Sequence, residues 1–313
     1  MLEFAANSYV SFVTLVIKST RQLYMRIPVF LASLLGLVSC ELTTPGSSEV
    51  QFSSEPTTTP VAPGQIDEAS GMADSRSQPG NLWIQQDSGS PAELILLGHD
   101  GTVKGKAAVP NASNRDWEEM ASGPGPQDGV NYLYIGEIGD NNGQYPTCLI
   151  YRLPEPANLQ TPIAQVERIN FKYPDGPRDA EAMFVDPKTK DIWIISKREP
   201  NVRLYKLPYP QNINEVTTAQ PFGELPYTFV TGAAISPDGS EIVLRTYTQI
   251  VYWKRQDGQS IADAMQKQSA RTLPYRQEPQ GEAICFGRDG RGYFTISEKA
   301  GASSVNLYYY AKK

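Results

Sequence analysis

The chain has 313 residues, enough for one large all-β domain or two smaller ones. Its 28 lysine and arginine residues against 34 aspartate and glutamate residues leave a net charge of -6, which gives no electrostatic case for a nucleic-acid partner. The single histidine, His99, excludes a multi-histidine metal site and argues against Ser-His-Asp and Cys-His catalysis.

An export signal is predicted over residues 1–39. Met25-Arg26 opens a short basic segment, and the stretch from Ile27 to Val38 is apolar. This order is typical of a secretory signal, and the apolar stretch is too short to span a membrane stably. Residues 1–24 fit such a signal poorly, so either the true start is Met25 or these residues form one long N-terminal region.

The apolar stretch ends in Leu37-Val38-Ser39-Cys40, which resembles the bacterial lipobox. The resemblance implies cleavage before Cys40, lipidation of its thiol, and an exported protein that a lipid anchors in the bacterial cell envelope. The alternative is an ordinary signal peptide with a chance cysteine. Residues 40–64 are rich in Ser, Thr, Pro and Glu, so beyond the lipidated cysteine we expect a flexible tether.

Residues 65–313 contain a fivefold repeat. Each copy starts an apolar strand with a small or acidic residue, at Ser70, Glu118, Glu181, Ala233 and Glu282. The intervals are 48, 63, 52 and 49 residues, close to the roughly 40–50 residues of a propeller blade. Second strands follow near Leu82, Leu133, Ile192, Ile242 and Tyr293, and third strands near Glu93, Leu149, Arg203, Ile250 and Asn306. The repeat predicts an all-β, five-bladed β-propeller, with a six-bladed ring or a β-sandwich as alternatives.

Fourth strands are predicted at 103–109, 166–173, 227–230 and 270–275. The fifth blade has no room for one before Lys313, so a segment ahead of Ser70 would close the ring and remove the exposed sheet edges. Prolines 56, 60 and 63 disfavour a strand, so we expect Glu49–Ser54 to close it. Cys148 and Cys285 fall in different blades and are expected to be free, buried thiols.

The repeat gathers acidic residues at one end of the ring. The start of a first strand and the end of an antiparallel second strand lie on the same face, so Ser70, Glu118, Glu181, the Ala233 backbone and Glu282 would circle the channel mouth. Converging carboxylates repel one another unless they are neutralised, and oxygen ligands suit Ca²⁺ before Mg²⁺. The alternative is that these glutamates hydrogen-bond neighbouring blades and hold no ion.

A second set of polar residues is predicted on the same face. It follows the second strands or precedes the ring acids, and comprises Asp87, Asp116, Asp140, Asn141, Arg178, Lys197, Arg198 and Arg245. Arginine and lysine beside a cation would form a seat for phosphate or carboxylate. The alternative is a solvated loop face with ordinary charges.

The order of residues at the blade starts resembles that of the calcium-activated apyrase nucleotidases, which are five-bladed propellers with Ca²⁺ in the central channel. The resemblance implies that Ser70, Glu118, Glu181 and Glu282 are calcium ligands. The family's fourth position is a serine, and here the repeat places Ala233. The blade starts are also similar to those of phytase-like and esterase-like propellers. The run Gly136–Asn141 looks like that of a family of uncharacterised bacterial exported proteins.

The leading hypothesis is a Ca²⁺-dependent hydrolase of a phosphorylated or esterified small molecule. Asp87, Asp116 or Asp140 would act as base. The anion would be held by Asn141, Arg178, Lys197, Arg198 and Arg245. The alternative is a non-catalytic ligand-binding or scaffolding lipoprotein. Either protein would be a monomer whose partners are a small anion and, through its lipid, the membrane.

Overall fold

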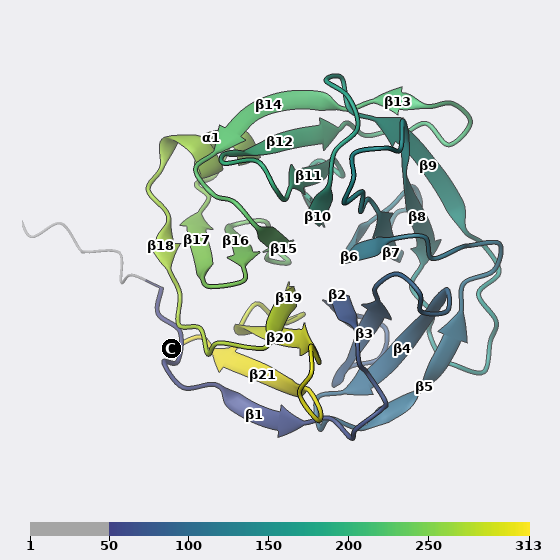
Figure 1. Ribbon diagram of the computed structural model, residues 1–313, viewed down its shortest axis with the longest axis vertical. Helices are drawn as coiled ribbons and strands as arrows, with labels where there is room; N and C mark the ends of the chain where they lie inside the picture. The colour runs from purple at the N-terminus through teal and green to yellow at the C-terminus, as the bar shows by residue number, and fades with distance from the viewer. Residues whose placement is uncertain (1–49) are drawn as a thin grey trace, which may run out of the picture. The chain divides into compact units, whose positions relative to one another are not determined.

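The fold was analysed in a computed structural model that describes residues 50–313 (Figure 1). Five sheets of mainly antiparallel strands stand around a central axis, which confirms the five-bladed β-propeller and makes the six-bladed and sandwich alternatives wrong. The predicted export signal and Cys40 lie outside the described residues. Among residues 50–313, no helix has the length and apolar character needed to cross a membrane.

The first three blades follow one another along the chain. Blade 1 consists of β2 (Ala69–Asp74), β3 (Asn81–Gln86), β4 (Glu93–Gly98) and β5 (Val103–Ala108). Blade 2 consists of β6 (Trp117–Pro124), β7 (Asn131–Glu137), β8 (Cys148–Pro154), β9 (Glu167–Lys172) and the short parallel β13 (Thr217–Thr218). Blade 3 consists of β10 (Ala180–Val185), β11 (Ile192–Ser196), β12 (Val202–Leu207) and β14 (Gln220–Leu225).

The last two blades complete the ring. Blade 4 consists of β15 (Val230–Ile235), β16 (Glu241–Thr246), β17 (Ile250–Lys254) and β18 (Arg271–Thr272). Blade 5 consists of β19 (Gln280–Phe286), β20 (Gly292–Glu298), β21 (Asn306–Ala311) and β1 (Thr57–Pro60). The strands nearest the axis are β2, β6, β10, β15 and β19, and β1 is the outermost strand of blade 5 (Figure 1).

The hydrophobic core lies between the blades rather than in one central mass. Each of five clusters of buried side chains combines residues of two neighbouring blades. Met72 of blade 1, for example, shares a cluster with Phe294 of blade 5. Both faces of each blade are therefore buried, which explains why the second strands read as continuous apolar runs.

The ring is closed by β1, not by the predicted Glu49–Ser54. Thr57 pairs with Tyr309 and Pro60 with Asn306, while in the expected segment Phe52 forms an isolated bridge to Lys312. Pro60 is tolerated because β1 is an edge strand, where the missing N–H faces no partner. Part of the predicted tether over residues 40–64 is therefore an ordered strand of the propeller.

Two other predictions need correction around blades 3 and 4. The fourth strand of blade 3 is β14 (Gln220–Leu225) rather than residues 227–230, and Val230 already begins blade 4. The sequence interpretation also missed the helix α1 (Ile261–Lys267), whose first turn is capped by the Ser260 side chain. The prediction of free, buried thiols at Cys148 and Cys285 is confirmed.

Candidate functional site

Each innermost strand carries a β-bulge close to its start. The pairing register with the second strand skips one residue in blades 1 to 4 and two in blade 5. The residues at the bulges are Ser70, Glu118, Glu181, Thr231 and Glu282, so Thr231 and not Ala233 is the fourth member of the ring. A bulge re-aims a side chain, and here it recurs at the channel mouth of each blade.

Thr231 makes the same contact in blade 4 that Ser70 makes in blade 1. The Ser70 hydroxyl donates to the Glu118 backbone carbonyl at 2.7 Å, and the Thr231 hydroxyl donates to the Gly281 carbonyl at 2.9 Å. In both cases the acceptor lies on the innermost strand of the following blade. A hydroxyl residue therefore occupies the fourth position of the ring.

Five carboxylates gather in two overlapping groups at the mouth, which we call the acidic centre. Asp87, Asp116 and Glu118 form one group, and Glu118, Asp179 and Glu181 form the other. Within each group, one oxygen from each residue lies within 4.8 Å of the others. Glu118 belongs to both groups and therefore links them.

Glu282 and Glu298 of blade 5 continue the acidic centre. The Gln280 side chain amide donates to Glu282 at 3.2 Å and also to Glu298. Burial, and after it the charge of Glu282, raise the pKa of Glu298 to about 10. The Glu298 carboxyl therefore lies in a buried place where a neighbouring acid adds negative charge.

The acids of the ring are poorly compensated within the described chain. Burial raises the pKa of Glu118 well above its ordinary value, with Glu181 as the next cause, and burial followed by Glu282 does the same to Glu181. One oxygen each of Glu181, Glu282 and Glu298 is buried without a hydrogen-bond partner among residues 50–313. Orphaned, buried carboxylate oxygens indicate a missing partner that carries positive charge.

The basic residues predicted to seat an anion are already engaged with acids. Buried Lys197 forms an ion pair with Glu181, and Arg198 forms one with Asp179 at 2.5 Å. Arg178 pairs with Glu199 and with Asp175. Only Arg198 keeps a large exposed fraction, 44% of its side chain.

Arg245 lies inside the protein and not on the predicted anion-binding face. Its side chain is fully buried, forms an ion pair with Glu278 and donates to the carbonyl oxygens of Ala283 and Ile296 at 2.6 and 3.1 Å. The tertiary fold uses this guanidinium to join blades 4 and 5. It is therefore not available to a ligand, which corrects the sequence interpretation.

Asp140 also has a structural role, because it holds the loop that follows it. It is buried, and its two carboxylate oxygens accept the backbone N–H groups of Gln144 and Tyr145, each at 2.8 Å. It therefore shapes its own loop and is a poor candidate for a base. Asn141, next in the chain, is exposed and accepts a hydrogen bond from Arg198, so it lies at the rim of the acidic centre.

Asp87 and Asp116 are the two acids of the centre that remain partly open to solvent. Burial, followed by the charge of Asp87, raises the pKa of Asp116 to about 6, and burial also raises the pKa of Asp87. A carboxylate with a pKa near neutrality suits proton transfer. Gly139 lies against the carboxylates of Glu118 and Asp116, and any side chain at this position would collide with them.

Glu119, which the sequence interpretation did not single out, seals the channel beneath the acidic centre. Its side chain is fully buried and reaches from β6 to accept the backbone N–H of Ala233 in β15 at 2.9 Å. It also accepts the N–H of Met120 at 3.0 Å. Burial raises the pKa of Glu119, and these hydrogen bonds oppose that rise. The carboxyl thus ties blade 2 to blade 4 across the axis.

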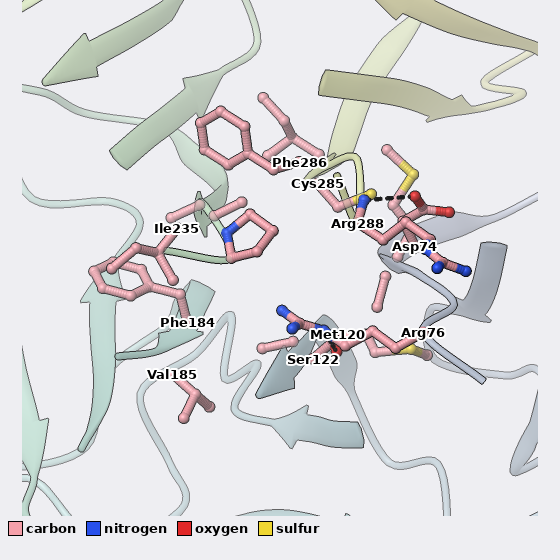
Figure 2. A pocket seen from close by; sticks show the side chains of 17 residues that line it. Asp74, Arg76, Met120, Ser122, Phe184, Val185, Ile235, Cys285, Phe286 and Arg288 are labelled. Carbon is pink, nitrogen blue, oxygen red and sulfur yellow. Dashed lines mark hydrogen bonds between the residues drawn. The ribbon is translucent and has the colours of Figure 1, made fainter. Parts of the chain in front are cut away.

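The opposite end of the channel, where the innermost strands end, has a different chemistry. A small cavity of about 40 Å³ lies there among apolar side chains that include Met120, Phe184 and Phe286 (Figure 2). Its charged residues are Asp74, Arg76 and Arg288. We call this end of the channel the distal end, and Asp74 is the one carboxylate among the residues that line this cavity.

The architecture and the acidic centre together define a five-bladed propeller with a candidate cation site at one mouth of its channel. No known protein family matches the sequence, and no curated protein does. Solved structures do match in fold. Hydrazine synthase of Kuenenia stuttgartiensis is 10% identical, with 79% of this chain and 96% of that chain covered and a TM-score of 0.41.

Two further structures are similar at the same level. The Cps50 (Swd1) β-propeller domain of Myceliophteria thermophila is 8% identical, with 80% and 99% of the two chains covered and a TM-score of 0.41. A luciferin-regenerating enzyme is 15% identical, with 79% and 78% covered and a TM-score of 0.42. Likeness at this distance concerns the fold alone and says nothing about what this chain binds.

Proposed function

We propose that the acidic centre binds Ca²⁺ and that the protein is a Ca²⁺-dependent hydrolase of a phosphorylated or esterified small molecule. The observation that carries the proposal is the set of buried, unpartnered oxygens on Glu181, Glu282 and Glu298. The five ring residues at the bulges carry side-chain oxygen atoms as possible metal ligands, and none of them carries a side-chain nitrogen or sulfur. Such a donor set suits a hard cation.

The residues present fit a calcium ion. Glu118, Glu181 and Glu282 would hold it, with the hydroxyl oxygens of Ser70 and Thr231 as neutral ligands. The pKa values of Glu118 and Glu181 are raised because like charges crowd in a buried place, and a bound dication removes that cost. Lys197 alone does not neutralise these charges, since its ammonium pairs with only one oxygen of Glu181.

Asp87 and Asp116 would act as the base. A calcium ion, when bound, supplies positive charge that polarises the ester or phosphoryl group. Asp116 or Asp87, at the open side of the centre, takes the proton of the attacking water. Arg198, the most exposed of the basic residues and adjacent to Asn141, orients the anionic part of the substrate.

A turnover screen of the purified chain tests this proposal. Nucleotide, phytate, simple phosphoester and lactone substrates are offered with Ca²⁺ and after chelation. We expect hydrolysis of one class only with Ca²⁺, its loss in Glu181→Gln, and no change in Glu55→Gln, an exposed acid far along the chain from the centre. Turnover that survives chelation would contradict the proposal.

The second candidate function is a non-catalytic binding lipoprotein that uses the same centre. The engagement of Lys197, Arg178 and Arg245 by acids favours it, because few basic groups remain to hold a substrate anion. Calcium binding without turnover on any substrate class would support this function over the hydrolase.

We further propose that the protein is exported and anchored in the bacterial cell envelope through a lipid on Cys40. The support is the lipobox-like Leu-Val-Ser-Cys at the end of a predicted signal. Cys40→Ser is expected to release the protein from the membrane fraction or leave it unprocessed. Unchanged membrane retention with a normally processed N-terminus would refute the anchor.

A further inference from the structure

A second cavity lies at the distal end, between the last blade and the first. Its volume is about 530 Å³, within the range of roughly 300–1,000 Å³ typical of small-molecule sites. Closure of the ring creates it, because Thr57 and Thr59 of β1 form part of its wall. Ser70 lies near the start of β2, at the acidic centre, and the cavity residue Asp74 ends that strand, so this cavity is separate from the acidic centre.

One side of this cavity is aromatic. The rings of His99 and Phe294 are 4.6 Å apart between centroids, and those of Phe294 and Tyr309 are 4.5 Å apart. All three line the cavity together with Leu307. A succession of flat rings at these distances suits a ligand with a flat, apolar body.

The chain's only histidine is held in place at this cavity. His99 Nε2 lies 2.8 Å from Asp74 Oδ1, and the other oxygen of the buried Asp74 accepts the backbone N–H of Arg288 at 2.7 Å. Both oxygens of Asp74 are thus in use, and its charge is directed away from a ligand. The His99 side chain is 34% exposed, so the ring is accessible from the cavity.

Arg288 supplies positive charge to the same cavity. Its side chain is exposed, and within residues 50–313 its guanidinium has no carboxylate at ion-pair distance. The other acid of the wall, Asp289, accepts the Arg291 backbone N–H at 2.9 Å and lies 4.0 Å from the Arg291 side chain. A guanidinium without a partner beside an aromatic wall favours an organic anion.

We propose that this cavity binds a small organic anion with a flat, apolar body. The carboxylate or phosphate of the ligand pairs with Arg288, and its flat body packs against the rings of His99, Phe294 and Tyr309. The ligand contacts both the closing strand β1 and the first blade. Its binding therefore holds the ring closed.

Proton NMR on the untagged full chain tests the proposal, since His99 is the only histidine and its ring signals need no assignment. The probes are benzoate, phenyl phosphate, benzamide and acetate. We expect benzoate or phenyl phosphate to shift the His99 signals, and whichever binds more tightly identifies the anionic group. Benzamide lacks the charge and acetate lacks the ring, so each binds about tenfold more weakly.

Arg288→Gln is expected to weaken binding of the anionic probe about tenfold, because a charge-assisted hydrogen bond is lost. Arg276→Gln changes an exposed arginine whose guanidinium lies over Tyr308, outside the cavity wall, and should leave binding unchanged. Both variants are shown to be folded if, without a probe, their His99 signals have the same positions as in the parent chain. The proposal is overturned if no probe shifts His99 in the parent chain, if acetate binds as tightly as benzoate, or if Arg288→Gln binds as the parent does.

Discussion

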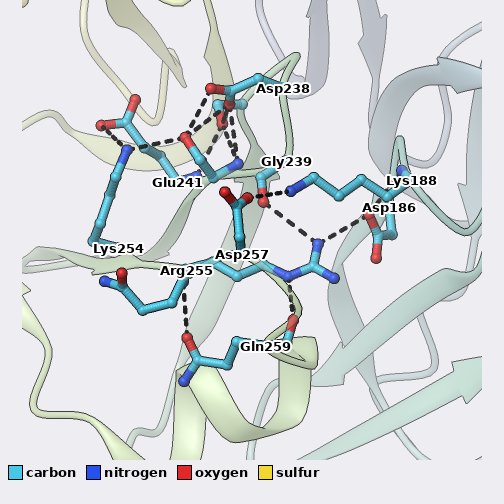
Figure 3. A network of polar contacts seen from close by, with 12 residues as sticks. Asp186, Lys188, Asp238, Gly239, Glu241, Lys254, Arg255, Asp257 and Gln259 are labelled. Atoms are coloured by element: carbon cyan, nitrogen blue, oxygen red, sulfur yellow. Dashed lines mark hydrogen bonds and ion pairs between the residues drawn. The ribbon is translucent and has the colours of Figure 1, made fainter.

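Two groups of acids in this propeller differ in how completely neighbouring side chains neutralise them. At the distal end, near the boundary of blades 3 and 4, Asp186 pairs with Arg255 at 3.1 Å and Glu241 pairs with Lys312 at 2.7 Å (Figure 3 shows Asp186, Arg255 and Glu241). Asp238 accepts hydrogen bonds from neighbouring serines, which lower its pKa to about 2 although burial opposes them. We call this group the matched network.

The acidic centre has comparable carboxylates but too few partners. The pKa values of Glu118 and Glu181 are raised. Buried oxygens of Glu181, Glu282 and Glu298 have no hydrogen-bond partner among the described residues, whereas each acid of the matched network has a hydrogen-bond or ion-pair partner. The difference teaches that acidic residues alone do not mark a site in this molecule. What distinguishes the candidate site is compensation that the described chain leaves incomplete.

The largest expected effect comes from breaking the matched network. Arg255→Met leaves Asp186 buried without its ion-pair partner, which costs about 3–5 kcal/mol of unfolding free energy. Urea denaturation measures the loss, and it should be the same with and without Ca²⁺. Lys267→Met removes an exposed pair with Asp263 and should have a far smaller effect, because solvent screens the two charges. A calcium-dependent loss in Arg255→Met would contradict the distinction between the two groups.

The next effect is the response of the acidic centre to calcium. Binding to the native state alone stabilises it by about 2.7 kcal/mol at a hundredfold excess over Kd, so the melting temperature should rise with Ca²⁺ and fall on chelation. Glu181→Gln should blunt the shift. Glu241→Gln changes the same residue type in the matched network and should leave the shift intact. Metal-stripped protein that gives no calorimetric heat and no thermal shift with Ca²⁺ would remove the main support for the site.

The pH dependence of stability should also differ between the two groups. The pKa of Glu298 is raised from 4.5 to about 10, so its contribution is present below pH 4.5 and is lost as pH rises toward 10. The unfolding free energy of metal-free protein should therefore fall with rising pH, by up to about 1.4 kcal/mol per pH unit for each proton that unfolding releases. Glu298→Gln and added Ca²⁺ should each flatten this decline.

Asp238 of the matched network provides the comparison for that measurement. Its pKa is lowered to about 2, so its contribution is present above its ordinary pKa of 3.8 and is lost as pH falls toward 2. Asp238→Asn should therefore lower stability by a constant amount above pH 3.8, remove part of the decline in acid, and leave the slope of the alkaline decline unchanged. Unfolding curves collected across the pH range separate the two variants, and a changed alkaline slope in Asp238→Asn would count against the assignment.

The smallest expected effect concerns the corrected fourth ring position. Thr231→Ala removes the hydrogen bond to the Gly281 carbonyl and should cost about 1 kcal/mol, with a weaker thermal shift by Ca²⁺. Thr231→Ser keeps the hydroxyl and should restore the calcium response. Ala233→Ser adds a hydroxyl at the position that the sequence repeat suggested and should not strengthen that response. If it does, the bulge register places the wrong residue in the ring.

The sequence alone predicted the features that repeat along the chain. Strand periodicity and the spacing from Ser70 to Glu282 determined the five blades, and four of the five ring residues, because one blade is a local unit of roughly 40–50 residues. The expectation of free thiols at Cys148 and Cys285 followed from the same register and is confirmed. Calcium and the lipid anchor stay predictions.

Only the tertiary structure decided which residues meet across the ring. Thr231 replaces Ala233 because a bulge, invisible in an apolar pattern, shifts the pairing of blade 4. Arg245 is not part of the site, because it forms an ion pair with Glu278 inside the protein. Glu119 links blades 2 and 4 across the axis, because its carboxylate accepts a backbone N–H 114 residues away. Burial and pairing depend on such remote partners, and no local pattern of residues specifies them.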